Sequence, residues 1–250
     1  MRVKYSFNEI DSKTKYVNSL YNKFILNPVS KLLVYAVANF TEIKPYVITI
    51  IGTFISLGSA ILFYNGFLLL GAFLFQISEI LDGCDGLLAK TKKIESVFGT
   101  FLDFYTDVLR LTVNIIAFSL FLIKKNLIET AFLLFVFLSL NFAESFIDIS
   151  YSRIKNIYLK TKEVKFTKIE QKILNLKNYL EKKGLKVNLF HYHERIFFVL
   201  FISPITGKFK AFTIIGIFLV LLSIHIKIIL DIAIIKDHII NHSKLYIRVK

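Results

Sequence analysis

The sequence contains no tryptophan and a single cysteine, Cys84. One cysteine excludes a framework of disulfides within the chain. Without tryptophan, an aromatic belt at a membrane interface has to be built from the 26 Phe and 12 Tyr residues. Internal repeats and low-complexity segments are also absent, and residues 1–30 are too polar and basic for a cleavable signal peptide. A fold held by disulfides or built from repeats is therefore not expected.

Acidic residues are scarce as well, since 18 Asp and Glu face 32 Lys and Arg for a formal charge of +14. Such a balance can indicate a nucleic-acid partner, but here the lysines concentrate between apolar runs. Hydrophobic residues make up 55% of the chain, the mean hydropathy is +0.59, and apolar runs close to a membrane span in length recur. The composition predicts an all-α integral membrane protein with no nucleic-acid partner.

The apolar runs predict a membrane domain over residues 45–250 with six transmembrane helices. These are expected at 46–64, 67–90, 97–123, 128–149, 196–205 and 212–235. Residues 1–44 predict an interfacial or juxtamembrane segment that contains an amphipathic helix, because apolar positions between 17 and 25 follow helical spacing. Residues 150–190 are polar and rich in lysine, which predicts a basic cytoplasmic insert between the fourth and fifth spans.

The distribution of basic residues predicts the orientation of these spans. If the N-terminus is inside, the inner segments hold 26 Lys and Arg residues and the outer turns hold 4. Positive charge is enriched in cytoplasmic loops. We therefore expect a multi-pass protein with both termini, and the acidic site described next, facing the cytoplasm.

Two pairs of aspartates mark the ends of the second and third apolar runs. Asp82 and Asp85 are three residues apart, and Asp103 and Asp107 are four apart, so each pair shares one helix face. Carboxylates at such positions are costly and indicate a functional site. Like charges held together need protons or cations to neutralise them, and hard divalent cations prefer oxygen ligands.

Three further residues indicate what the acidic site binds. Gly86 follows an acid and Gly99 lies one turn before Asp103, so neither presents a side chain to a bulky ligand. Lys90 adds a cation suited to a phosphate once metals have offset the acids. This pattern predicts a two-metal site for a diphosphate.

From Asp82 to Asp107 the spacing Asp-x2-Asp-Gly-x2-Ala-Lys-x8-Gly-x3-Asp-x3-Asp resembles the signature of the CDP-alcohol phosphotransferase (CDP-alcohol phosphatidyltransferase) family. These are integral membrane enzymes of phospholipid and related synthesis. The fixed positions match except Lys90, where the family normally has Arg. A weaker resemblance covers residues 45–49, where Tyr46 replaces the Asn of a Pro-Asn-x-Ile-Thr motif.

The resemblance implies a metal-dependent reaction in which an acceptor hydroxyl attacks the phosphorus of a CDP-alcohol, releases CMP and leaves a phosphodiester. It implies that two divalent cations, Mg2+ or Mn2+, are held by Asp82, Asp85, Asp103 and Asp107. It implies that Asp107 is also the catalytic general base. The implied nucleotide-binding residues are Asp82, Gly86, Ala89, Lys90 and Gly99.

The acceptor is harder to infer from the sequence. Arg153 and Arg195 resemble basic positions that bind the acceptor's phosphate in members that use inositol phosphate, although they could equally meet lipid headgroups. Arg110, one turn after Asp107, is expected to pair with that acid or with a substrate. We expect the acceptor to be inositol phosphate or another polyol and the donor to be a CDP-linked lipid.

Several polar residues within or beside the spans have no settled role. Glu144 and Asp148 share a face, and either contact the acceptor or pair with Arg110 or Arg153. Gln76 and Glu79 either support the aspartates or are polar filling. His191 and His193 do not share a helix face, which argues against a zinc site.

Two alternative functions are compatible with the same residues. One is a transferase whose donor is a soluble CDP-polyol. The other is a cation transporter that uses the aspartates as its ion site, and metal-dependent release of CMP would exclude it. Family members are often dimers, so a homodimer is a further expectation.

Overall fold

The computed structural model describes residues 4–14, 21–158, 175 and 192–248, with only the backbone described for 148–158 and 230–248. Helices account for the regular structure of these ranges, and no strand occurs within them. The prediction of an all-α protein is therefore confirmed for the described part of the chain.

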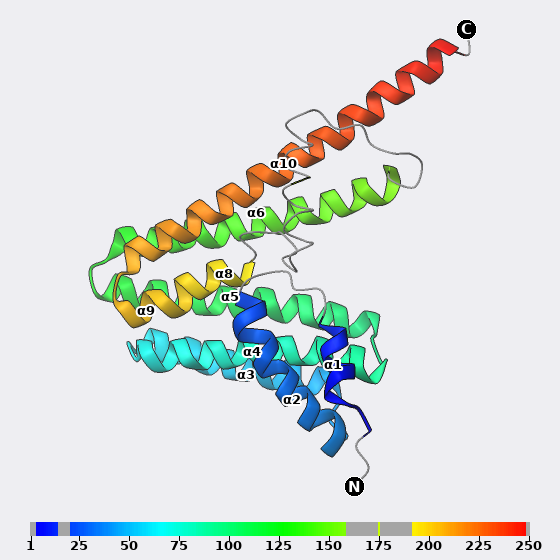
Figure 1. The fold of residues 1–250 in the computed structure, drawn as a ribbon. Helices are drawn as coiled ribbons and strands as arrows, with labels where there is room; N and C mark the ends of the chain where they lie inside the picture. The colour runs from blue at the N-terminus through cyan, green and yellow to red at the C-terminus, as the bar shows by residue number, and fades with distance from the viewer. Residues whose placement is uncertain (1–3, 15–20, 159–174, 176–191, 249–250) are drawn as a thin grey trace.

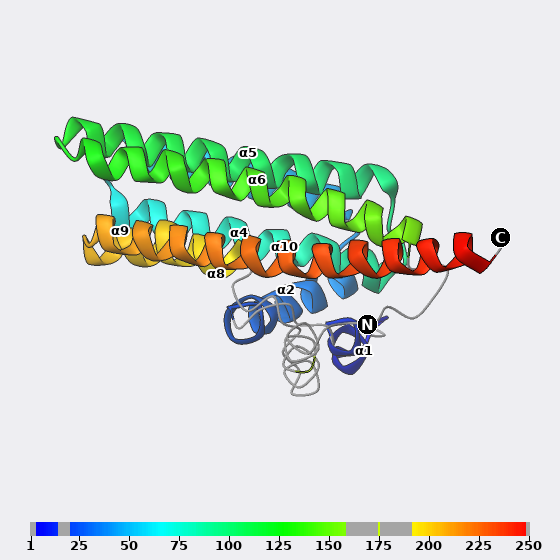
Figure 2. The ribbon, with the colours of Figure 1, turned by 90° about the horizontal axis from the view of Figure 1, so that it is seen from above.

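Within each described range the helices follow one another with short connections (Figure 1). They are α1 (Phe7–Lys13), η1 (Asn22–Leu26), α2 (Asn27–Phe40), α3 (Pro45–Tyr64), α4 (Leu68–Lys92), α5 (Val97–Lys124), α6 (Ile128–Tyr158), α8 (Tyr192–Ile196), η2 (Phe197–Ile202), α9 (Ser203–Thr206) and α10 (Phe209–Arg248). The long helices run roughly side by side, and α1 and α2 pack on one side of them (Figures 1 and 2).

Tight turns between α3, α4 and α5 decide where the acidic residues lie. Gly66, with φ of 84°, reverses the chain after α3, and Lys93 ends α4 in the left-handed conformation. Ser96 then caps α5, its Oγ accepting a hydrogen bond from the Gly99 N–H at 3.0 Å. Since α4 ends and α5 begins at the same end of the bundle, Asp85 and Asp103 come together there.

Aromatic and aliphatic side chains fill the centre of the bundle. Phe63, Phe75, Phe118 and Phe137 are fully or almost fully buried and pack with residues from α3 to α6, η2 and α10. A smaller cluster joins Val34 and other apolar residues of α1 and α2 to the second half of α4. It includes Cys84, which is buried by packing, as expected for a small residue within a helix.

Four of the described helices are long and apolar enough to cross a membrane, judged by length and composition. They are Pro45–Tyr64, Val97–Lys124, Ile128–Ile147 and Phe209–Ile229. They support an integral membrane protein. The full set of six spans, their orientation and the interfacial position of the N-terminal segment stay predictions.

Two helices extend further than the apolar runs indicated. α6 continues to Tyr158 instead of ending near residue 149, and α10 continues to Arg248 instead of ending near residue 235. Neither extension contains glycine or proline, so backbone hydrogen bonding continues after the apolar run has ended. The predicted insert over 150–190 therefore begins as helix, and its remainder, apart from residue 175, lies outside the described residues.

A glycine allows α10 to approach η2 and α6 closely. A Cβ at Gly216 would lie 2.7 Å from Val199 Cγ2 and 3.0 Å from Phe137 Cε2. We expect Gly216→Ala to lower the free energy of unfolding by about 1 kcal/mol, because the overlap outweighs the better helix propensity of alanine. Thermal unfolding in detergent measures this.

Gly58→Ala is the matched control for that substitution. A Cβ there would make ordinary contact with Leu74 Cδ2 at 3.5 Å, so alanine should leave the midpoint unchanged or raise it. Equal effects of the two substitutions would show that close packing at Gly216 is unimportant.

Candidate active site

Three of the four aspartates form a compact group between α4 and α5. One carboxylate oxygen each from Asp82, Asp85 and Asp103 lies within 4.8 Å of the other two. Such a set of oxygen donors suits a hard divalent cation, because close carboxylates favour a positive charge between them. The residues present therefore fit the predicted metal site.

The fourth aspartate joins this group through an arginine. Arg110 pairs through one guanidinium nitrogen with both Asp82 Oδ1 and Asp107 Oδ1. Its other terminal nitrogen donates to the Ser78 carbonyl at 3.3 Å, and only 2% of its side chain is exposed. The pairing with Asp107 that the sequence left open is thus present, while a contact between Arg110 and the acceptor stays a prediction.

Asp85 has a neutral partner on α3. The Thr49 hydroxyl donates a hydrogen bond to Asp85 Oδ2, and both side chains are buried. Thr49 belongs to the segment beginning at Pro45, which carried only a weak resemblance in the sequence. Its contact with an acid of the main motif depends on how α3 packs against α4, so the sequence did not reveal this role.

One cavity, of about 520 Å³, opens beside this group and will be called the donor-side cavity. Its lining includes Asp85, Gly86, Ala89, Lys90, Gly99 and Asp103. A Cβ built on Gly86 would meet no atom within 4 Å, so this glycine leaves room for a ligand. The predicted nucleotide-binding residues other than Asp82 thus line one cavity. Tyr46 lines the same cavity.

A substitution at Lys90 tests whether the cation on the wall of the donor-side cavity has to be a lysine. We expect Lys90→Arg to retain activity within about threefold, because both side chains carry a positive charge to a phosphate. Measuring transfer rate against donor concentration checks this, with Lys44→Arg, on the same cavity wall but outside the motif, as control. A well-folded but inactive Lys90→Arg variant would show that this chain uses the position differently from the family that its signature resembles.

A second cavity, of about 360 Å³, lies on the Asp107 side of α5 and will be called the acceptor-side cavity. Asp107, His193, Arg195 and Lys227 contribute to its wall together with Glu144. Arg195 Nη1 lies 2.5 Å from Glu144 Oε2, and Lys227 Nζ lies 2.7 Å from Glu144 Oε1. Two cations therefore share one carboxylate beside Asp107.

This arrangement gives Glu144 two partners that the sequence analysis did not identify. Glu144 pairs with Arg195 and Lys227, whereas the sequence offered Arg110 or Arg153 as its partner. These partners reach Glu144 because α8 and α10 place their cations against α6. A contact of Glu144 with the acceptor or with Arg153 stays a prediction. The side chains of Asp148 and Arg153 lie outside the described part, so the predicted acceptor contact of Arg153 stays a prediction.

Sequence reasoning missed two residues of the acceptor-side cavity. Lys227 was not singled out in the sequence, and His193 was considered only for zinc. His193 Nδ1 instead lies 3.2 Å from Glu79 Oε2, so Glu79 has a specific partner. The sequence signal that could have identified Lys227 as a functional residue is its position as a charged side chain inside an apolar run.

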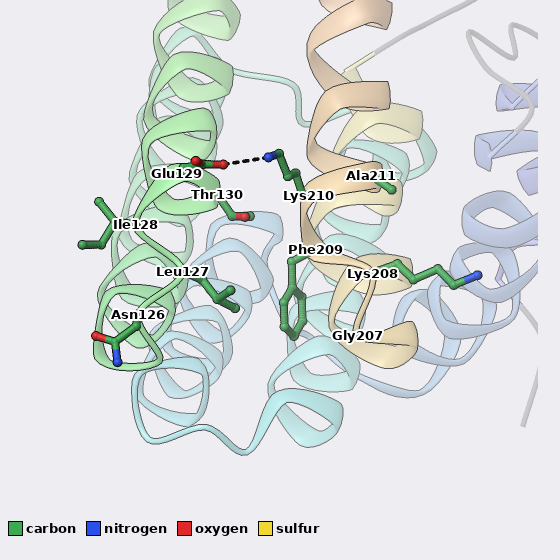
Figure 3. Close-up of a pocket in the computed structure, with 10 residues that line it drawn as sticks. All are labelled: Asn126, Leu127, Ile128, Glu129, Thr130, Gly207, Lys208, Phe209, Lys210 and Ala211. Atoms are coloured by element: carbon green, nitrogen blue, oxygen red, sulfur yellow. Dashed lines mark hydrogen bonds and ion pairs between the residues drawn. The ribbon is translucent and has the colours of Figure 1, made fainter.

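A third cavity, of about 660 Å³, lies where the α5–α6 turn meets the start of α10 (Figure 3). Lys210 Nζ pairs with Glu129 Oε2 there at 2.7 Å, and both side chains are mostly exposed. The cavity lies at the end of α5 opposite Asp103. It therefore takes no part in the acidic site.

Comparison with known proteins agrees with this geometry. A family model described as CDP-alcohol phosphatidyltransferase matches residues 42–174. The match covers more than half of the chain and contains all four aspartates. The chain belongs to the CDP-alcohol phosphatidyltransferase family, so it is a CDP-alcohol phosphotransferase. No curated protein matches the sequence.

Solved structures of phosphatidylinositol phosphate synthase from Mycobacterium tuberculosis are similar in fold. The apo structure is 18% identical with a TM-score of 0.50, covering 80% of this chain and 94% of that one. The structure with CDP-DAG bound is 17% identical with a TM-score of 0.49, covering 81% and 93%. At 18% identity the apo structure shows likeness of fold alone.

Proposed function

We propose that this protein transfers a substituted phosphate from a CDP-linked lipid to a hydroxyl of a phosphorylated polyol, releasing CMP. The observation that carries the proposal is the position of the aspartates between two cavities of different character. The donor-side cavity is lined by the family signature. The acceptor-side cavity combines Asp107 with Arg195 and Lys227.

A lipid-linked donor is supported by the surface beside the donor-side cavity. Phe98 lines this cavity and is largely exposed, as are Val97 and Phe101 nearby on α5. Exposed apolar side chains on a membrane helix suit contact with acyl chains. The CDP group can then occupy the cavity while its lipid tails stay in the bilayer.

The chemistry proposed for the site assigns each acid a task. Asp82, Asp85 and Asp103 would hold divalent cations, Mg2+ or Mn2+, with Asp107 completing the predicted set. Such cations supply positive charge to the diphosphate oxygens. Lys90 adds charge on the donor side. Asp107 accepts the proton of the acceptor hydroxyl as that oxygen bonds to phosphorus and the bond from phosphorus to CMP breaks.

A phosphorylated acceptor is supported by the charge of the acceptor-side cavity. Arg195 and Lys227 share one carboxylate there, Glu144, while Asp107, the other acid in the lining, pairs with Arg110. Arg195 is 2% exposed, and its Nε has no hydrogen-bond partner among the described residues. A buried donor of this kind favours an anionic ligand, since leaving it unpaired is costly.

Purified protein in detergent or lipid nanodiscs tests this function. Radiolabelled CDP-diacylglycerol is incubated separately with serine, choline, glycerol phosphate and inositol phosphate, with Mg2+, with Mn2+ or with EDTA. We expect product and CMP with a phosphorylated polyol and a divalent cation, and neither with EDTA. Product only with serine or choline would overturn the proposed acceptor.

Two further outcomes of that assay separate the alternative functions. Transfer from a soluble CDP-polyol, without transfer from CDP-diacylglycerol, would overturn the proposed donor. Absence of CMP release with every donor, together with cation uptake into vesicles, would indicate a transporter. The cytoplasmic position of the site and a homodimer stay expectations, which cysteine labelling from each membrane side and the mass in nanodiscs would test.

A further inference from the structure

A histidine–glutamate pair lies beside the acceptor-side cavity, with His193 in the cavity lining and Glu79 behind it. His193 Nδ1, at the start of α8, lies 3.2 Å from Glu79 Oε2 on α4. The two side chains are 15% and 6% exposed. Neither residue belongs to the signature that begins at Asp82, and His193 lies beyond residues 42–174. The pair is therefore a feature of this chain that the motif does not account for.

An aromatic residue of the N-terminal part holds this pair in place. The Tyr21 ring stacks with the His193 ring, their centroids 6.2 Å apart and their planes at 24°. Tyr21 also packs against Phe197, with ring centroids 5.0 Å apart. Aromatic packing of this kind limits how far the imidazole can turn.

Hydrogen bonds fix Tyr21 in turn. Gln76 Nε2 donates to the Tyr21 hydroxyl oxygen, and the Tyr21 backbone N–H donates to Glu194 Oε1 at 3.3 Å. Burial, followed by the nearby Glu79 carboxylate, raises the pKa of Tyr21, which keeps its phenol neutral. Tyr21, which directly precedes η1, thus forms one packed group around His193 together with residues of α4 and α8.

The location of the group connects it with the reacting end of the cavity. Glu79 lies one turn before Asp82 on α4, and His193 shares the cavity wall with Asp107 and with the cations Arg195 and Lys227. With its phosphate at Arg195 and Lys227, a polyol acceptor in this cavity would have His193 among the side chains around its hydroxyls. An imidazole can bond a hydroxyl as a donor or as an acceptor.

We propose that His193 binds a hydroxyl of the acceptor and helps to select it, and that Glu79 and Tyr21 are positioning residues that act through His193. The proposal rests on the proposed function, because it takes the acceptor-side cavity as the binding site. Its physical basis is that a site built to hydrogen-bond a substrate hydroxyl discriminates strongly against analogues without it.

Steady-state kinetics of single variants test the proposal. We expect His193→Ala to raise the KM for the acceptor about tenfold, the loss of roughly one good hydrogen bond, with the KM for the CDP-linked donor unchanged. His193→Gln keeps a hydrogen-bonding group and should recover part of this loss. Tyr21→Ala removes the ring that stacks with His193 and should also raise the acceptor KM, with the donor KM unchanged.

A double-mutant cycle separates positioning from a merely structural effect. Glu79→Ala should also raise the acceptor KM, but adding it to His193→Ala should change little further, because both remove the same contact. Glu129→Ala, at the exposed pair with Lys210, is the control and should leave both KM values unchanged. Full additivity of Glu79→Ala and His193→Ala would overturn the positioning role of Glu79.

The outcomes also distinguish this proposal from the function on which it rests. If the parent protein uses a phosphorylated polyol but folded His193→Ala and His193→Gln variants keep the parent acceptor KM, the role of His193 is overturned and the function stands. If the parent protein transfers only to serine or choline, the proposed function fails first. A raised donor KM in both His193 variants would likewise contradict an acceptor role.

Discussion

Asp107→Asn is expected to lower the rate of phosphotransfer by about a thousandfold or more while leaving the fold intact, within the range that general acid–base catalysis contributes. Asparagine has nearly the same shape, and its amide oxygen can still accept a hydrogen bond from Arg110. It cannot take the proton of the acceptor hydroxyl. The measurement is CMP release and product formation from CDP-diacylglycerol at saturating acceptor.

The matched control for this substitution is Asp11→Asn. Asp11 lies on α1, is largely exposed and pairs with Lys31, so the same chemical change there should leave transfer unaffected. Size-exclusion profiles and thermal midpoints of both variants should resemble those of the parent protein. Retained turnover of a folded Asp107→Asn variant would remove the role of Asp107 as the base.

Arg110→Met is expected to have the largest effect on stability. The arginine is 2% exposed and pairs with Asp82 and Asp107, so methionine fills much of its space but leaves two carboxylates without their cation. Breaking a buried ion pair from one side costs about 3–5 kcal/mol. We expect a thermal midpoint about 10 °C lower in EDTA, together with loss of transfer activity.

Divalent cations and an exposed ion pair provide the controls for Arg110. If Asp82, Asp85 and Asp103 bind Mg2+, adding it should recover part of the lost midpoint, because the cation binds the folded site and replaces some of the missing charge. Lys210→Met breaks the exposed pair with Glu129 and should shift the midpoint little. An Arg110→Met variant as stable as Lys210→Met would contradict the importance of the buried pairs.

The effects predicted for Asp107→Asn and Arg110→Met arise in one group of contacting residues. Arg110 contacts the predicted base, Asp107, and a predicted metal ligand, Asp82, through the same nitrogen. A change at either acid therefore alters the electrostatic environment of the other. Effects of combined substitutions at these three positions should be non-additive, since contacting residues share interaction energy.

The sequence by itself determined the protein class and most of the acidic site. Spacings of three and four residues place Asp82 with Asp85, and Asp103 with Asp107, on shared helix faces wherever the helices lie. Length and apolarity similarly determine which helices can cross a membrane. These features are local, so helix geometry alone is enough to predict them from the sequence. The signature from Asp82 to Asp107 identifies the family.

Only the tertiary structure decided how the acids are partnered and what surrounds them. Three aspartates form one oxygen cluster, while Arg110 links Asp107 to Asp82. The pairs of Glu144 with Lys227 and of Glu79 with His193 join residues 83 and 114 positions apart. Such contacts depend on how each helix is rotated and packed against its neighbours, and no periodicity within a single helix encodes that rotation.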